Sequence, residues 1–138
     1  VAEQSDVIVM ERSPLSDQIF MRTLHDEGAV DDLEYALYQD WCNLWSLVLP
    51  FRISLFLYIR TDLDQCMSRL QQRSRDGETG VSRDYQAHLL REHDREFHRP
   101  VLADGTTCLV IDGSPDYRQD SVLRQRLMQQ VAQACRWQ

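Results

Sequence analysis

Short apolar runs alternate along this chain with longer segments in which apolar residues recur every three or four positions. Continuous apolar runs are typical of strands buried on both faces, and they occur at 7–10, 53–59 and 109–111. The longer segments indicate helices, at 16–25, 31–49, 62–72, 82–97 and 119–136. Because strands and helices alternate, the pattern predicts an α/β fold, a parallel sheet flanked by helices in three α/β/α layers.

Capping and turn residues mark where the predicted helices begin and end. Ser16 and Ser82 are candidate N-caps, Gly28 lies in the turn after the first helix, and Pro50 ends the second helix. In that second helix the apolar residues form a single stripe, made of Leu33, Leu37, Trp41, Leu44, Trp45 and Val48. Packing into a core and contact with a second copy of the chain explain this stripe equally well.

Composition limits the classes of partner. The chain has 138 residues, 43% hydrophobic and 27% charged, which suffices for one compact domain with a core. Its net charge of -7 argues against a general nucleic-acid partner, and no apolar run is long enough to cross a membrane. The four scattered cysteines lack metal-ligand spacing, so we expect free thiols in a reducing compartment.

Chemistry is expected just after the strands, because parallel α/β sheets bind ligands at the carboxyl ends of their strands. Glu11, Arg12 and Ser13 directly follow the first apolar run. A carboxylate there suits magnesium, and a guanidinium beside it suits developing charge on a phosphoryl oxygen. Taken alone, these three residues are better explained as a surface Glu–Arg pair with Ser13 capping the next helix.

A longer stretch reverses that preference. Residues 11–20, Glu-Arg-Ser-Pro-Leu-Ser-Asp-Gln-Ile-Phe, resemble the Glu-Arg-Ser-x-x-Ser-Asp/Ala-x-x-x-Phe motif of the deoxynucleoside kinase family, with one residue fewer between Asp17 and Phe20. The resemblance implies that Glu11 binds magnesium and that Arg12 contacts the reacting 5′ oxygen. It also implies that Phe20 stacks on the substrate base and that Asp17, as in the deoxycytidine/deoxyguanosine branch, tunes the choice of base.

Two further segments resemble the same family. Tyr-Gln-Asp-Trp at 38–41 matches a helix of deoxycytidine kinase, and Leu-Tyr-Ile-Arg-Thr at 57–61 resembles the family's Tyr-Leu-Arg-Thr strand end. After that strand, Leu63 and Asp64 replace the usual Pro-Glu. The resemblance covers essentially the whole chain and implies the fold of the P-loop nucleoside kinases.

Three arginines gather around a predicted loop at 73–80. Arg69 and Arg73 share a helix face, and Arg75 lies just beyond the helix end. Converging guanidiniums suit a polyphosphate, and a loop that closes over ATP excludes water. The alternative is a solvated face paired with nearby acids, which are Asp62, Asp64, Asp76 and Glu78.

The family resemblance favours the first interpretation of this segment. Residues 69–78 resemble the family's lid, Arg-x-x-x-Arg-x-Arg-x-Glu-Glu, and the lid as a whole would span about 69–82. The implied roles are contact with the adenine of ATP for Arg69, phosphate binding for Arg73 and Arg75, and binding of the sugar 3′-hydroxyl for Glu78. Gly77 stands where the family has its first lid Glu.

The segment after the third apolar run resembles the family's adenine-binding loop, Asp-x-x-x-Asp-Phe. Here the sequence is Asp-Gly-Ser-Pro-Asp-Tyr at 112–117. The resemblance implies ATP contacts for Asp116 and Tyr117, with Tyr117 beside the adenine. A turn that caps the last helix explains the same residues almost as well.

One element of such a kinase is absent from the chain. A P-loop, Gly-x-x-x-x-Gly-Lys-Ser/Thr, needs a lysine, and all 15 basic residues are arginine. The family resemblance also places the catalytic base upstream of these residues. We therefore expect residues 1–138 to be a partial kinase domain that lacks its N-terminal strands and is inactive by itself.

For the parent protein we expect ATP- and magnesium-dependent phosphorylation of a deoxynucleoside 5′-hydroxyl, with deoxycytidine or a deoxypurine as substrate. Two alternatives stay open. One is a non-catalytic assembly subunit with the kinase fold, of which respiratory complex I contains an example, and the other is a nucleoside monophosphate kinase such as thymidylate kinase. The resemblance further implies a homodimer in the cytoplasm or the mitochondrion, and we expect no nucleic-acid or membrane partner.

Overall fold

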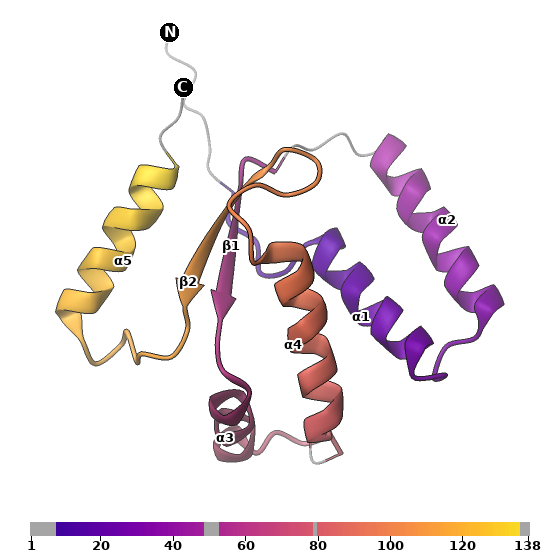
Figure 1. Cartoon of the computed structure of the whole chain (residues 1–138), viewed down its shortest axis with the longest axis horizontal. Coiled ribbons are helices and arrows are strands. Elements are labelled where there is room, and N and C mark those ends of the chain that lie inside the picture. Colours follow the sequence, from indigo (N-terminus) through magenta and orange to yellow (C-terminus); the bar gives the residue numbers. More distant parts are fainter. Residues whose placement is uncertain (1–7, 49–52, 79, 136–138) are drawn as a thin grey trace, which may run out of the picture. The chain divides into compact units, whose positions relative to one another are not determined.

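The computed structural model describes residues 8–48, 53–78 and 80–135 of the chain. The chain divides into two compact units, Val1–Leu49 and Pro50–Gln138, and each unit is described by itself. As Figure 1 shows, the described part of the first unit is a pair of helices, and that of the second is a pair of strands with three helices.

The first unit consists of α1 (Pro14–Asp26) and α2 (Asp32–Val48). Helix α1 begins earlier than predicted, because Ser13 and not Ser16 is its N-cap. The Ser13 hydroxyl accepts a hydrogen bond from the Ser16 amide at 3.2 Å, and the Ser16 hydroxyl accepts one from the Ser13 amide at 3.0 Å. This reciprocal capping box satisfies two backbone amides and places the first turn of α1 directly after Arg12.

Helix α1 ends in the predicted glycine turn. Gly28 has φ of +73°, the left-handed region that glycine adopts without a steric penalty. Its amide donates to the His25 carbonyl at 2.9 Å, and the Ala29 amide donates to the Leu24 carbonyl at 2.9 Å. These bonds satisfy carbonyls at the helix end and reverse the chain toward α2.

The apolar run at 7–10 does not form the predicted strand in its described part, and residue 7 lies outside the described residues. Ile8, Val9 and Met10 belong to no strand, and their exposed fractions are 82%, 84% and 67%. A strand is stable only beside another strand that pairs its amides and carbonyls. An apolar run indicates a tendency to be buried, but it does not supply that neighbour.

Helix α2 carries the predicted apolar stripe on an exposed face. Trp41 and Trp45 are 56% and 50% exposed, and their rings stack with centroids 6.0 Å apart. The other members of the stripe are also at least half exposed, namely Leu33, Leu37, Leu44 and Val48. Within the described part of the first unit, this stripe is therefore not packed into a core.

The second unit is built on two parallel strands, β1 (Leu55–Arg60) and β2 (Thr107–Asp112). Leu57 pairs with Leu109, and Arg60 pairs with Asp112, so the two strands end at the same level. The predicted strands at 53–59 and 109–111 are confirmed with shifted ends. Because the pairing is parallel, the residues that follow each strand meet at one edge of the sheet.

Three helices accompany these strands: α3 (Leu63–Arg73), α4 (Arg83–Phe97) and α5 (Ser121–Ala134). The Ser82 hydroxyl caps α4 as predicted, accepting a hydrogen bond from the Tyr85 amide at 3.1 Å. Helix α5 begins later than predicted, because the Asp120 carboxylate accepts hydrogen bonds from the amides of its first turn. None of the described helices is long and apolar enough to cross a membrane.

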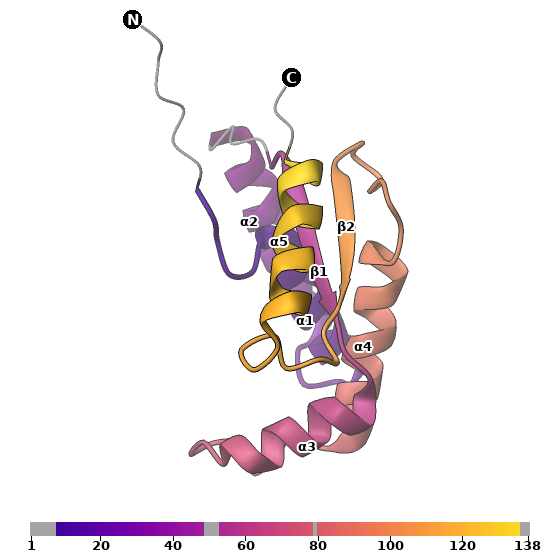
Figure 2. The ribbon, with the colours of Figure 1, turned by 90° about the vertical axis from the view of Figure 1, so that its left-hand side faces the viewer.

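Helix α4 packs on one face of the strands and forms the core of the second unit. The Phe97 ring stacks on Phe56 of β1 at 5.4 Å, and the Cys108 thiol of β2 contacts the Phe97 carbonyl at 3.3 Å. The buried apolar residues of this core are Leu89, Phe97, Leu102, Cys108 and Ile111. Helix α5 lies on the other side of the strands, as comparison of Figure 1 and Figure 2 shows, so helices flank both faces as predicted.

Candidate functional site

The loop after β2 lies directly against the end of β1. The Gly113 amide donates a 2.7 Å hydrogen bond to the Arg60 carbonyl, which extends the pairing of the strands by one step. A Cβ atom at this glycine would lie 2.2 Å from Thr61 Oγ1 and 3.1 Å from the Arg60 carbonyl oxygen. Only glycine therefore allows the backbones to approach this closely at the carboxyl edge of the sheet.

Two side chains of α3 hold this loop by its carbonyl groups. Arg69 Nη1 donates to the Gly113 carbonyl at 2.7 Å, and Arg69 Nη2 donates to the Ser114 carbonyl at 2.9 Å. Gln65 Nε2 donates to the same Ser114 oxygen, also at 2.9 Å. The sequence resemblance implies that Arg69 lies against adenine, and here its guanidinium also joins the lid helix to the loop that would contact adenine.

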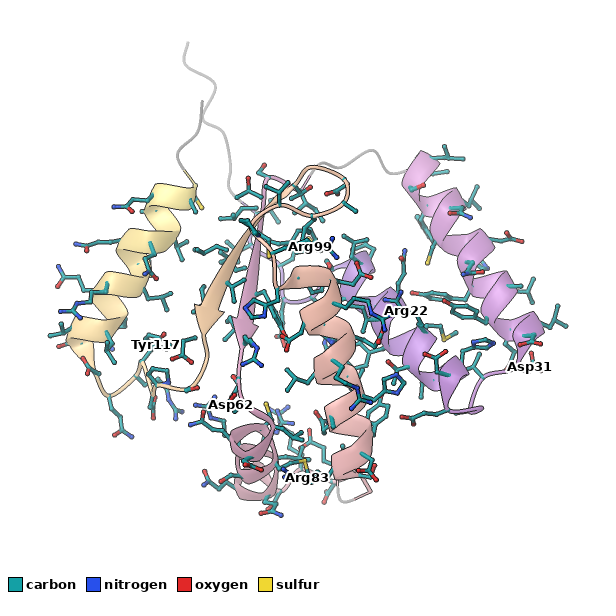
Figure 3. All side chains as sticks on the ribbon, in the orientation of Figure 1. Arg22, Asp31, Asp62, Arg83, Arg99 and Tyr117 are labelled. Carbon is teal, nitrogen blue, oxygen red and sulfur yellow. The ribbon has the colours of Figure 1, made fainter. Side chains whose placement is uncertain are left out.

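The loop at 112–117 is stiffened from within. Asp112 Oδ1 accepts a hydrogen bond from the Ser114 amide at 2.9 Å, and the Tyr117 hydroxyl donates to the Asp112 carbonyl at 2.7 Å. Figure 3 shows Tyr117 in the turn between β2 and α5, at the same end of the strands as Asp62. The Tyr117 ring is thus anchored at the edge where ligands of such sheets bind.

The second acidic residue of this loop, Asp116, is paired with a neighbouring arginine. Asp116 accepts hydrogen bonds from Nε and Nη2 of Arg118, both at 3.0 Å. These bonds, and to a smaller extent the charge of Arg69, lower the pKa of Asp116. Asp116 is therefore an acceptor and not a donor toward any ligand at neutral pH.

In the predicted lid, two residues that were assigned different ligands contact each other. Arg73 Nε donates to Glu78 Oε2 at 3.0 Å, and Nη2 of the same arginine bonds the other carboxylate oxygen. Gly77 has φ of +87°, so this position of the turn requires the left-handed region that a Glu adopts only under strain. Arg75, the third lid arginine, is exposed in the turn.

Helix α3, which leads into the predicted lid, is also tied to α4, the helix that follows it. Arg83 at the start of α4, labelled in Figure 3, forms an ion pair with Asp64 of α3. Asp64 stands where the family has a Glu, so the carboxylate is retained at that position. The two helices that flank the lid are thereby linked at their N-terminal turns.

Sequence reasoning missed a polar cluster at the end of β1, formed by Tyr58, Arg60 and Asp94. Asp94 of α4 accepts the Tyr58 hydroxyl at 2.8 Å and Arg60 Nε at 3.0 Å, while Arg60 Nη2 bonds its second oxygen at 3.2 Å. Burial first, and then the hydrogen bond to Asp94, raises the pKa of Tyr58. Two sequence signals pointed toward it: the match of residues 57–61 to the family's Tyr-Leu-Arg-Thr strand end and that of His93-Asp94 to a His-Glu pair of the family.

In the first unit, the guanidinium carbon of Arg12 lies 4.3 Å from the centroid of the Phe20 ring. Arg12 has φ of 66°, a conformation that costs a non-glycine residue energy and that clusters at functional sites. The capped first turn of α1 and this backbone kink together direct Arg12 back over Phe20. The structure thus brings together two residues that the sequence assigned to the substrate.

Asp17 lies on the exposed side of the first turn of α1 and contacts helix α2. The Tyr38 hydroxyl donates a hydrogen bond to Asp17 Oδ2 at 2.7 Å. Tyr38 opens the Tyr-Gln-Asp-Trp segment that the sequence comparison singled out without a role. The one-residue deletion between Asp17 and Phe20 leaves them three residues apart, on one face of α1.

Glu11 is exposed, immediately before the Arg12 kink. Among the described residues no three or more His, Cys, Asp or Glu side chains gather closely enough to hold a metal by themselves. Magnesium in kinases is typically bound through one or two carboxylates together with substrate phosphates and water. A single exposed carboxylate at Glu11 fits that kind of site.

The predicted site residues therefore form two groups, one in each unit. Glu11, Arg12, Asp17 and Phe20 lie around the start of α1 in the first unit. The second unit holds the lid and loop residues, which are Arg69, Arg73, Arg75, Glu78, Asp116 and Tyr117. In the first group Arg12 contacts Phe20, and in the second Arg73 contacts Glu78.

The chain resembles known proteins over most of its length. Residues 1–136 match the family described as deoxynucleoside kinase. Deoxycytidine kinase 2 of Gallus gallus is 28% identical over 130 residues, which make up 88% of this chain and 49% of the relative. The probable deoxycytidine kinase of fowlpox virus is 32% identical over 123 residues, 83% of this chain and 49% of the relative. The chain thus spans about half the length of these relatives.

The fold agrees with that of a solved kinase. Deoxyadenosine kinase from M. mycoides, with the products dCMP and a flexible dCDP bound, superposes with a TM-score of 0.72 at 22% sequence identity. The superposition covers 94% of this chain and 65% of that kinase. This match supports the P-loop kinase-like α/β class, and the family match spans both units. The chain belongs to the deoxynucleoside kinase family.

Proposed function

We propose that the full-length protein containing this chain transfers the γ-phosphate of ATP to the 5′-hydroxyl of a deoxynucleoside. The observation that carries the proposal is the contact between α3 and the 112–117 loop at the carboxyl edge of β1 and β2. There Arg69 joins the lid helix to the 112–117 loop through two hydrogen bonds of 2.7 and 2.9 Å. A rigid loop beside a row of arginines is suited to the base and the phosphates of a nucleotide.

Each candidate residue has a chemical task in this reaction. Glu11 supplies a carboxylate to magnesium, which bridges the phosphates of ATP and offsets their charge. Arg12 stabilises charge near the 5′ oxygen, and Phe20 stacks on the base. The remaining tasks are phosphate binding by Arg73 and Arg75, contact with the 3′-hydroxyl by Glu78, and contact with the adenine side of ATP by Arg69, Asp116 and Tyr117. Catalysis of this kind depends on positioning and on electrostatic stabilisation.

Asp17 supports a preference for deoxycytidine or a deoxypurine over thymidine. A carboxylate only accepts hydrogen bonds, and the exocyclic amino group of cytosine or adenine donates them. Thymine presents an acceptor, O4, at the corresponding position. A competition assay with equal concentrations of the deoxynucleosides tests this preference, and a strong preference for thymidine would contradict it.

The proposal is tested with the full-length protein, ATP, magnesium and the four deoxynucleosides, by separating 5′-monophosphate products. We expect monophosphate formation that depends on magnesium. The 138-residue chain by itself is the matched control, and we expect no turnover from it because it contains no lysine for a P-loop. Lack of turnover by the full-length protein would favour a non-catalytic subunit. Preferential use of nucleoside monophosphates would favour a monophosphate kinase.

We also propose that the protein is a homodimer, with the exposed stripe of α2 as a candidate contact. Trp41 and Trp45 form the centre of that stripe and are both at least half exposed. Aromatic residues at the centre of an apolar patch are typical of protein interfaces. Sedimentation of the full-length protein tests this directly. A monomer at micromolar concentration, or a dimer that Trp41→Glu leaves intact, contradicts the assignment to α2.

The protein is further proposed to act in the cytoplasm or the mitochondrion. The four cysteines are all free thiols in the structure, which agrees with a reducing environment. Fractionation of cells that express a tagged full-length protein tests this. Recovery in the secreted fraction would contradict it.

A further inference from the structure

A single side-chain hydrogen bond ties Asp17 of α1 to helix α2. The Tyr38 hydroxyl donates to Asp17 Oδ2 at 2.7 Å, between residues 21 positions apart in the sequence. The distance is that of an ordinary O–H···O hydrogen bond, and a hydroxyl that donates to a carboxylate forms a charge-assisted bond about twice as strong as a neutral one. The partner of Asp17 is therefore a specific, charge-assisted donor.

The hydrogen bond to Oδ2 fixes the orientation of the Asp17 carboxylate and therefore the direction in which Oδ1 points. A carboxylate has two oxygens with about four acceptor sites, and Tyr38 occupies one of the sites on Oδ2. Asp17 is exposed on the first turn of α1, so without a tether its side chain would sample several rotamers. A tether removes that freedom before a ligand arrives, which lowers the entropy that a ligand must oppose.

Tyr38 is suited to this task because it stays protonated. It is half buried beside α1, and burial first, then hydrogen bonds to Cys42 and Asp17, raises its pKa. A neutral phenol remains a donor toward Asp17 over the whole physiological pH range. The tyrosine thus offers the carboxylate a fixed donor that does not titrate with it.

The same face of α1 carries the aromatic residue assigned to the base. Phe20 follows Asp17 by three residues, and its ring lies 4.3 Å from the guanidinium carbon of Arg12. A base stacked on that face would present its edge toward the polar residues of the same helix face. The orientation of the Asp17 carboxylate then decides which exocyclic group is accepted.

We infer that Tyr38 is a positioning residue for base selection, holding Asp17 so that its carboxylate accepts the exocyclic amino group of the base. This inference rests on the proposed function, and specifically on the proposed role of Asp17. It adds a residue outside the substrate-contacting set, acting from another helix. Its alternative is a purely structural tie between α1 and α2.

The test is a double-mutant cycle on the full-length protein with Tyr38→Phe, Asp17→Ala and the combination. The measured quantity is the ratio of kcat/KM for deoxycytidine to kcat/KM for thymidine, which does not depend on the fraction of folded enzyme in the assay. We expect Tyr38→Phe to lower this ratio about fivefold, less than the loss of a complete hydrogen bond to a charged group. We expect no further change when Tyr38→Phe is added to Asp17→Ala.

Tyr35→Phe is the matched control, because it removes a hydroxyl from the same helix at a residue whose ring stacks on His25 and not on Asp17. It should leave the ratio unchanged. If Asp17→Ala lowers the ratio but Tyr38→Phe does not, the inference is wrong and the proposed role of Asp17 stands. If Tyr38→Phe lowers the ratio equally in both backgrounds, Tyr38 acts independently of Asp17. An unchanged ratio in Asp17→Ala overturns the role of Asp17 and this inference with it.

Discussion

Arg69 in α3 donates a 2.7 Å hydrogen bond to the carbonyl oxygen of Gly113, a residue 44 positions further along the chain. The acceptor is a backbone group, so the contact does not depend on the side chains of the loop. The donor belongs to the helix that leads into the lid. Helix α3, which leads into the predicted lid, is thereby joined to the 112–117 loop.

Arg69→Lys keeps the charge but not the planar fork that reaches two carbonyls at once. We expect the KM for ATP to rise about tenfold, which corresponds to the loss of one to two hydrogen bonds. Steady-state kinetics of the full-length enzyme measure this. Arg126→Lys, on exposed α5, is the control and should leave KM unchanged. Equal KM values for Arg69→Lys and wild type would show that the hydrogen bonds from Arg69 to the Gly113 and Ser114 carbonyls do not affect ATP binding.

Gly113→Ala should destabilise the protein by about 1–3 kcal/mol, the usual cost of overpacking. The new Cβ would lie 2.2 Å from Thr61 Oγ1, 2.9 Å from Ile59 Cγ2 and 3.1 Å from a backbone carbonyl oxygen. Urea unfolding of the full-length protein measures the change. In the control, Gly80→Ala, the added carbon meets nothing within 4 Å, and the free energy of unfolding should change by less than about 0.5 kcal/mol.

Asp94→Asn should lower the free energy of unfolding by about 1–3 kcal/mol, because it leaves the partly buried Arg60 without its bidentate partner. The control concerns the same arginine. Asp62 also contacts Arg60, at 3.4 Å, but its side chain is 73% exposed. Asp62→Asn should therefore change stability by less than about 1 kcal/mol. Similar losses in both variants would contradict the importance of partial burial.

The raised pKa of Tyr58 predicts how stability depends on alkaline pH. Its folded pKa is above the unfolded value of about 10, so the stability that it contributes is fully present below about pH 10 and is lost as pH rises toward the folded pKa. The free energy of unfolding should fall as the pH rises above about 10, with a shallower slope in Tyr58→Phe. Denaturant titrations at several pH values measure this. Parallel slopes would contradict the prediction.

Glu78→Gln tests the pairing inside the lid. Glu78 holds Arg73 through two hydrogen bonds, and the neutral amide cannot retain this ion pair. We expect the KM for the deoxynucleoside to rise about tenfold, while the KM for ATP stays equal or falls because Arg73 is released toward phosphate. Asp76→Asn makes the same change of charge in the same loop and should alter neither constant. A raised KM for ATP in Glu78→Gln would contradict the pairing.

Local structure followed closely from local sequence. The helices at 62–72 and 82–97 were predicted because their apolar periodicity and the Ser82 cap act over one or two turns. Ser13 and Ser16 show the limit of this reasoning. Both are good N-caps. Ser13 is the cap in the structure, because Ser13 and Ser16 bond each other reciprocally and Pro14 occupies the first helical position.

Burial did not follow from apolar sequence alone. The run at 7–10 was predicted as a buried strand, and its described residues are exposed and unpaired in any sheet. The stripe of α2 was correctly located, but its exposure was not predictable. An apolar residue tends to be buried, and only the tertiary structure decides whether a neighbouring element is present to bury it.

By itself the sequence determined the order of the helices and of the two strands that form, the parallel α/β class and the identity of the candidate site residues, because these depend on residue types and short spacings. Only the tertiary structure decided the partners: Tyr38 with Asp17, Arg60 with Asp94, and Arg69 with Gly113. These pairs are 21, 34 and 44 positions apart. Hydrogen bonds act over about 3 Å and depend on distance in space, not on separation in the sequence. Such pairs therefore exist only once folding has brought their helices and strands together.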